Sequence, residues 1–185
     1  MDGYHARMLI SASLVLLMTA PGLALFYGGM SRSKSVLNMM MMSFSALAVV
    51  GIVYVLWGWS MSYSDGDVAT LFANPFTHFG LKDVAAADYV FVAFQLTFAV
   101  ITAALISGAI ADRVKSSAWL VFLPIWVTLS YFPLAHMVWG GGFLSHNPDG
   151  RAALLFGTVG EGMEKVAEVA PVDYAGGTAV HINAG

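Results

Sequence analysis

The sequence contains no cysteine and very few charged residues. Charged side chains make up 10% of the 185 residues, against about 25% in soluble domains, so the composition excludes an ordinary soluble globular protein. Without cysteine, the chain has neither disulfides nor thiolate metal sites. The net charge of -3 is small, and the absence of a basic stripe argues against nucleic-acid binding. Apolar residues are plentiful instead, at 58%, and they indicate a membrane protein.

Long apolar runs predict an all-α, polytopic helical membrane protein, because a helix of about 20 apolar residues crosses the hydrocarbon core. Residues 1–185 form one transmembrane domain with four complete spans, at about 8–28, 36–63, 89–111 and 117–139. A fifth run starts near Asp173 and continues to Gly185. As a helix it would reach about 20 Å, less than the core thickness of about 30 Å. We therefore expect either a fragment of a longer protein, which we favour, or a chain that a partner completes.

The first apolar run has a second interpretation, as a secretory signal peptide. Arg7 precedes the run, and residues 20–24 are mostly small. However, the run continues through residues 25–27, and a stronger positive cluster follows it. These features favour a spanning helix over a cleaved signal.

The distribution of basic residues predicts the orientation. The two short loops between predicted helices hold Arg32, Lys34, Arg113 and Lys115. Because basic residues concentrate in cytoplasmic loops, the short loops should face the cytoplasm. The N-terminus and the long segments 64–88 and 140–172 should then face outside, which also places Asp173 near the outer surface.

An acid and a histidine stand out in the small, apolar fifth run. Asp173 and His181 lie eight residues apart, which on one continuous helix places them on roughly the same side, about 12 Å apart. Ionisable residues within membrane segments are functional-site candidates by default. Asp173 can also cap the N-terminus of the helix. For His181, a hydrogen bond between helices and a position in a pore both fit the pattern.

Aromatic side chains gather where the third predicted helix begins and the fourth ends. Phe94 and Phe98 are one turn apart and share a face. Tyr131, His136 and Trp139 lie toward the outer end of the fourth helix. These residues form either an interfacial belt with core packing or a vestibule that holds a small cation against ring faces. Periodicity leaves both interpretations open.

Other chemistry receives little support from the sequence. No paired carboxylates or nucleophile–base arrangement indicates an enzyme. The glycines at 140–142 are not followed by Gly-Lys-Ser/Thr, so they indicate a turn rather than a phosphate loop. The methionines at 39–42 indicate adaptable packing rather than a metal site. We therefore predict no metal and no cofactor.

Four motifs occur in order and at compatible spacing across nearly the whole chain. They are PGLALFYGG at 21–29, FQLTFA at 94–99, AHMVWGGG at 135–142 and DYAGGTAVHINA at 173–184. Together they resemble the Amt branch of the Amt/Mep/Rh ammonium transporters. The resemblance implies the first half of an eleven-helix transporter, with two five-helix halves of inverted topology. It also implies a homotrimer with one pore per subunit.

The resemblance further implies roles for individual residues. Phe94 and Trp139 would line the outer site that recruits ammonium, and Phe98 would form one ring of a gate below it. His181 would be the first of two pore histidines. Asp173 would support the outer site without touching the ion.

Tyr131 and Gly177, together with Asp173, would be the residues that support this site.

The implied function is transport across a cell membrane. Ammonium, or methylammonium as its analogue, is deprotonated, and ammonia crosses while the proton is relayed separately. A PII-type regulator would dock on the cytoplasmic face. An ammonium sensor on the same fold and an unrelated helical channel remain as alternatives.

Overall fold

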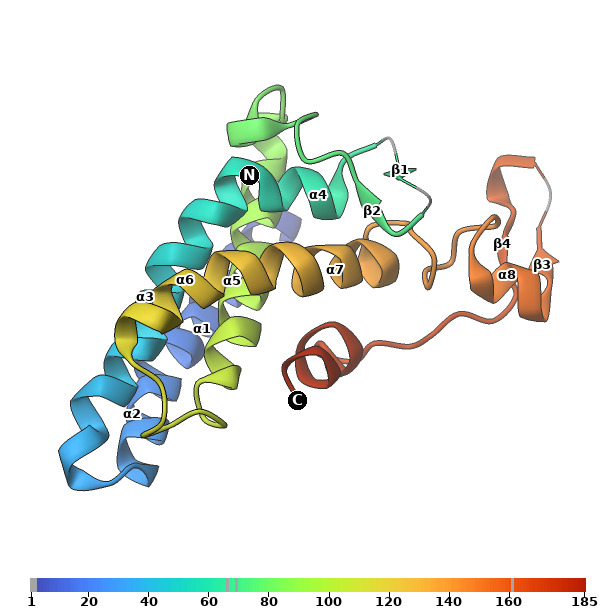
Figure 1. Ribbon diagram of the computed structural model, residues 1–185. Helices are drawn as coiled ribbons and strands as arrows, with labels where there is room; N and C mark the ends of the chain where they lie inside the picture. The colour runs from blue at the N-terminus through green and yellow to red at the C-terminus, as the bar shows by residue number, and fades with distance from the viewer. Residues whose placement is uncertain (1–2, 66, 69, 161) are drawn as a thin grey trace.

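Long apolar segments form helices that pack side by side (Figure 1). The computed structural model describes residues 3–65, 67–68, 70–160 and 162–185. Within these residues, four helices are long and apolar enough to cross a membrane: Gly3–Met30, Ser33–Tyr63, Ala86–Ile106 and Ser116–Trp139. A helix satisfies its backbone hydrogen bonds internally, which hydrocarbon requires. The predicted helical membrane fold is confirmed.

Three of these spanning helices contain a π-helical turn. The first consists of α1 (Gly3–Leu17), η1 (Met18–Gly22) and α2 (Leu23–Met30). The second begins with the 3-10 turn η2 (Ser33–Ser35) and continues as α3 (Val36–Val53), η3 (Tyr54–Gly58) and α4 (Trp59–Tyr63). The third consists of the 3-10 turn η5 (Ala86–Asp88) and α5 (Tyr89–Ile106). The fourth consists of α6 (Ser116–Trp126), η6 (Val127–Tyr131) and α7 (Phe132–Trp139).

Proline accompanies two of the π-turns. Pro21 lies inside η1, and Pro124 lies in α6 shortly before η6. Proline cannot donate a backbone hydrogen bond and its ring clashes with the carbonyl four residues earlier, so the helix must adjust locally. The Thr128 hydroxyl donates to the Pro124 carbonyl at 2.7 Å and satisfies an acceptor in this irregular region.

Close packing and hydrogen bonds join the second and fourth spanning helices. The indole N–H of buried Trp119 donates to the Met42 carbonyl at 3.0 Å. Further along, the Trp57 indole donates to the Thr128 hydroxyl at 3.0 Å. At Gly58 a Cβ would lie only 2.4 Å from Cζ of Phe132, so this close approach requires glycine. These contacts hold the second and fourth spanning helices together.

The third spanning helix ends earlier than the sequence predicts. The apolar run extends to residue 111, but α5 ends at Ile106. The backbone N–H groups of Ser107 and Gly108 donate to carbonyls three residues earlier, which tightens the chain into turns. The Tyr27 ring packs close to Gly108, where a Cβ would lie 2.9 Å from Cζ. Hydropathy continues through this turn although the helix does not.

The two short loops lie at the same end of the bundle. Arg32 follows α2, and Asp112 follows α5 by six residues. The Arg32 guanidinium and the Asp112 carboxylate form an ion pair, with Nε and Oδ2 3.7 Å apart. The four predicted loop cations are therefore carried by neighbouring loops.

The long segments between helices contain small elements that the sequence analysis treated as loop. In the first segment, β1 (Asp67–Val68) pairs antiparallel with β2 (Phe72–Ala73), and the 3-10 turn η4 (Phe79–Leu81) follows. The second segment contains α8 (Arg151–Phe156), β3 (Thr158–Val159), η7 (Gly162–Glu164) and β4 (Val166–Ala167). Strands β3 and β4 pair antiparallel beyond the end of α7 (Figure 1).

The fifth helical segment begins later than the sequence predicts. It is the π-helix η8 (Gly177–Ile182), whereas the apolar run suggested a start at Asp173. Gly176 has φ +80°, a left-handed conformation that cannot belong to a right-handed helix. Asp173 therefore precedes the helix, and the predicted axial separation of Asp173 and His181 on one helix is wrong.

Candidate functional site

Three aromatic rings meet where α5 approaches the end of α7. The ring centroids of Phe94 and Phe98 are 4.9 Å apart, with the rings inclined at 79°. Phe98 also meets Trp139, at 5.8 Å and 69°. All three side chains are partly exposed. Aromatic faces carry partial negative charge, so this aromatic cluster can hold a cation.

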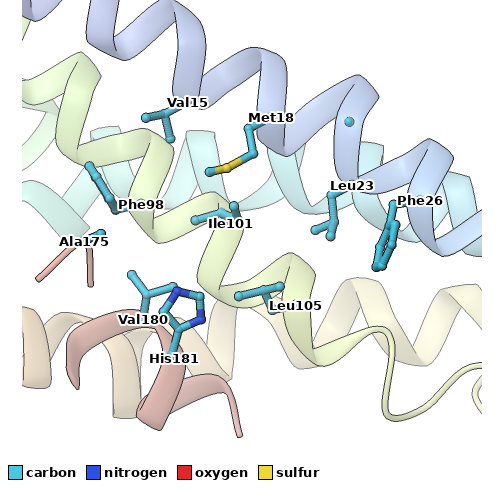
Figure 2. A pocket seen from close by; sticks show the side chains of 11 residues that line it. Val15, Met18, Leu23, Phe26, Phe98, Ile101, Leu105, Ala175, Val180 and His181 are labelled. Atoms are coloured by element: carbon cyan, nitrogen blue, oxygen red, sulfur yellow. The ribbon is translucent and has the colours of Figure 1, made fainter. Parts of the chain in front are cut away.

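An apolar cavity of about 500 Å³ adjoins this aromatic cluster. Figure 2 shows its walls, which come from the first spanning helix, from α5 and from η8. Its lining consists of Val15, Met18, Gly22, Leu23, Phe26, Phe98, Ile101, Leu105, Ala175, Val180 and His181. The imidazole of His181 is the polar side chain in this set, so it faces an otherwise hydrocarbon surface.

Phe98 belongs to both the aromatic cluster and the cavity wall. On one side it contacts Phe94 and Trp139, and on the other it lines the cavity together with His181. Phe98 therefore lies between the other two rings and the cavity. The structure brings together all four residues that the sequence analysis assigned to the pathway.

His181 is held by an unusual backbone arrangement. Its N–H donates to the Gly176 carbonyl at 2.9 Å, five residues earlier, and the Val180 N–H donates to the same carbonyl at 2.8 Å. This widened turn projects the imidazole toward α5 (Figure 2). The side chain is exposed in the described chain, so its position is set by the backbone rather than by burial.

Asp173 caps the segment that carries His181. Its Oδ1 accepts from the Thr178 N–H at 3.2 Å, and its Oδ2 accepts from the Ala179 N–H at 3.1 Å. These donors belong to the first helical turn, where backbone N–H groups have no partner within the helix. Both carboxylate oxygens are engaged, which fixes the start of η8 and places a negative charge there.

The glycine that the backbone requires is Gly176 rather than Gly177. A Cβ at Gly176 would lie 2.5 Å from Cγ2 of Val180, and φ is +80°. A Cβ at Gly177 would meet only Asp173 Oδ1, at an ordinary 3.7 Å. Gly177 is the first residue of η8 and lies beside Asp173, but its position does not require glycine.

Tyr131 and His136 are buried rather than part of an open vestibule. Tyr131 is 1% exposed and lies in η6, which packs against α5. The Thr102 hydroxyl of α5 donates to the Phe98 carbonyl, four residues earlier. His136 is fully buried, with Nδ1 3.0 Å from the Ser62 carbonyl oxygen.

The sequence analysis missed most of the cavity lining. Ile101 and Leu105 continue the face of α5 begun by Phe94 and Phe98, at spacings of three and four residues, so helical periodicity could have identified them. Val15 and Met18 gave no comparable signal, because every position of the first apolar run is apolar or small. The hydrogen bond between Ser130 and Asn183 was also missed, since it joins positions 53 residues apart.

Four spanning helices packed around an aromatic cluster and an apolar, histidine-edged cavity define a multi-pass helical membrane protein. The profile of the Ammonium Transporter Family matches residues 6–185. The chain belongs to this family, whose members are transporters and not enzymes. The alternative of an unrelated helical channel is therefore excluded.

Individual relatives agree with this assignment. The ammonium transporter of Mycobacterium tuberculosis (strain H37Rv) is 48% identical over 206 aligned residues, covering 99% of this chain and 40% of the relative. That of Aquifex aeolicus is 44% identical, with 99% and 40% covered. The chain thus spans about 40% of the length of these relatives.

Solved structures show the same fold. The crystal structure of Candida albicans Mep2 superposes with a TM-score of 0.74 and 30% identity, over 99% of this chain and 37% of that one. A structure described as a sensor Amt protein reaches a TM-score of 0.75 at 23% identity, over 96% of this chain and 40% of that one. The second match shows a shared fold alone.

Proposed function

We propose that the protein transports ammonium across a cell membrane, recruiting the cation at the outer aromatic cluster and passing ammonia through the cavity beside His181. The observation that carries the proposal is the position of Phe98, which contacts Phe94 and Trp139 and also lines the cavity with His181. A cation-binding surface and an apolar passage are thus separated by one ring.

Recruitment follows from the electrostatics of the rings. A cation over aromatic faces gains about 0.5–1 kcal/mol at an exposed site and about 2 kcal/mol when it is desolvated. Trp139 offers the strongest such face, and Phe94 lies across Phe98 from it. Methylammonium, a cation of the same type, should bind there as an analogue.

Deprotonation follows from the cavity lining. An ion moved into a surface of aliphatic and aromatic carbon loses hydration that the lining cannot replace, whereas neutral ammonia loses much less. The ammonium ion therefore gives its proton to a water molecule on the outer side of Phe98, and the proton travels separately. His181 can accept and donate hydrogen bonds within the cavity, so it serves this relay.

The supporting residues act through position and charge. Asp173 holds the first turn of η8 and contributes a negative field that favours a cation nearby. Tyr131 is buried in η6, which packs against α5 and so supports the helix that carries Phe98. Gly177 is the first residue of η8 and lies beside Asp173.

Orientation and partners form part of the same proposal. The short loops joined by Arg32 and Asp112 carry a concentration of basic residues, which supports a cytoplasmic location and an N-terminus outside. From family membership, we propose a homotrimer in the lipid bilayer and a PII-type regulator on the cytoplasmic face. Native mass spectrometry of the purified complex and copurification with the regulator test these two points.

An uptake assay tests the central proposal. The whole polypeptide should restore methylammonium uptake to cells that lack their own ammonium transporters. Ammonium should compete with methylammonium for this uptake, whereas potassium should not. A protein that reaches the membrane in normal amounts without restoring uptake would contradict transport and favour a sensing role.

A further inference from the structure

Asn183 ties the segment that carries His181 to the fourth spanning helix. The Ser130 hydroxyl donates to Asn183 Oδ1 at 2.6 Å. Asn183 Nδ2 donates to the Ala179 carbonyl at 3.3 Å, within the same segment. Both Ser130 and Asn183 are partly buried. One amide side chain therefore joins two segments that are distant in sequence.

Both ends of this link lie at π-helical turns. Ser130 belongs to η6, and Asn183 directly follows η8. A π-turn interrupts the regular hydrogen-bond ladder of a helix and often occurs at functional sites. Where the ladder is irregular, side-chain hydrogen bonds to neighbouring helices determine how the turn is rotated.

The link acts from the side away from the cavity. Helical residues two positions apart do not face each other, so Asn183 and His181 lie on different sides of their segment. His181 lines the cavity (Figure 2), whereas Asn183 meets Ser130 of η6. A rotation that broke the link would therefore turn the imidazole relative to the cavity.

We infer that Ser130 and Asn183 are positioning residues that set the direction in which His181 enters the cavity. Neither residue belongs to the cavity lining, so they act through His181 rather than on the solute. The inference rests on the proposed function, in which His181 serves the transport pathway.

The chain contains a matched control for this pair. The Ser116 hydroxyl donates to Asn38 Oδ1 at 2.6 Å and links α6 to α3. Neither Ser116 nor Asn38 lines the cavity. Removing this bond eliminates a hydrogen bond between the same two kinds of side chain, but one that does not involve η8.

The first test measures uptake per membrane-inserted transporter, with the whole polypeptide, as a function of pH. Ser130→Ala and Asn183→Ala should each lower the rate about 5- to 100-fold, because displacements of about 1 Å at a reacting group reach the upper figure. Both should alter the pH profile. The double variant should be no slower than the slower single variant, because the two changes break one interaction. Ser130→Thr retains the hydroxyl and should restore both rate and profile.

The second measurement is independent of transport. Diethyl pyrocarbonate modifies accessible imidazoles, and mass spectrometry gives the rate for each histidine. In Ser130→Ala and Asn183→Ala the reactivity of His181 should change, while His78 and His146 in the outer segments serve as internal references. Ser116→Ala and Asn38→Ala should behave like the wild type in both measurements.

The results distinguish a positioning role of Ser130 and Asn183 from a general effect on stability and from a failure of the proposed function. Wild-type uptake, pH profile and His181 reactivity in Ser130→Ala would overturn the inference, as would equal changes in the control pair. If Asn183→Ala fails to insert, Ser130→Ala and its Thr rescue decide the matter. If the wild type does not transport but His181 reactivity responds as expected, the proposed function fails and the positioning role stands.

Discussion

Phe98 is the residue that joins the two parts of the proposed pathway. Its ring contacts both Phe94 and Trp139, and it also lines the cavity that His181 edges. In the proposed function, the aromatic faces bind the cation, the hydrocarbon lining passes the neutral molecule, and the imidazole of His181 relays the proton. Substitutions at different points along this path should therefore have different effects.

Replacing Trp139 with Leu should weaken recruitment while preserving the fold. Loss of the ring removes about 0.5–2 kcal/mol of cation attraction, which corresponds to a half-saturating concentration about 2- to 30-fold higher. Concentration-dependent methylammonium uptake measures this shift. Trp126→Leu, in the same spanning helix but stacked on Phe122 away from the cavity, is the control. Equal effects of the two changes would reduce Trp139 to a packing residue.

Substitutions at Asp173 separate its capping role from its charge. Asn carries no charge but retains one acceptor oxygen, so it can keep one of the two backbone hydrogen bonds, whereas Ala loses both and with them a cap worth about 1 kcal/mol. We expect little or no uptake from Asp173→Ala and reduced uptake from Asp173→Asn. Uptake is normalised to membrane abundance, and thermal stability of the oligomer is measured alongside. Wild-type uptake by Asp173→Asn would show that capping alone explains this residue.

At the scale of elements, apolar runs predicted the spanning helices because hydrocarbon leaves the backbone few alternatives. They could not predict the π-turns, since hydropathy carries no information on which carbonyl accepts the hydrogen bond of each backbone N–H. The end of α5 at Ile106 and the late start of η8 were missed for the same reason. For the site, motif and periodicity identified the aromatic residues and His181, but the link between Ser130 and Asn183 depends on tertiary packing.

The start of η8 provides a sharp test at this scale. Gly176→Ala forces a left-handed conformation that costs about 1–2 kcal/mol for other residues, and its Cβ meets Val180. We expect a lower unfolding temperature and less protein in the membrane. Gly177→Ala, where a Cβ has ordinary contacts, should be nearly neutral by comparison. Thermal unfolding followed by fluorescence-detected size exclusion compares the two, and equal stability would contradict the strained turn.

At the scale of the whole molecule, the chain lines an apolar cavity beside an aromatic cluster and spans about 40% of the length of its relatives. The ion pair of Arg32 with Asp112 holds two basic loops together at one end of the bundle. The aromatic cluster lies beside Trp139, at the end of α7. The basic loops follow α2 and α5, whereas the aromatic cluster lies at the end of α7, so the proposed transport has a defined direction relative to the bundle.

Labelling of single cysteines tests this orientation. The 185 residues contain no cysteine, so Ser33→Cys and Asp149→Cys introduce reporters at exposed positions of a short loop and of an outer segment. In an otherwise cysteine-free polypeptide, a membrane-impermeant maleimide should label Asp149→Cys in intact cells. It should label Ser33→Cys only after permeabilisation. The reverse pattern would invert the proposed topology.

Substitution of His181 tests the pathway most directly. The whole polypeptide, wild type or with His181→Ala, is reconstituted into liposomes at equal protein density, and methylammonium uptake is measured under an inward gradient. The control is His146→Ala, an exposed position in an outer segment. We predict that His181→Ala abolishes or strongly reduces uptake and that His146→Ala leaves it unchanged. Uptake by His181→Ala at the wild-type rate would contradict a route through the cavity beside His181.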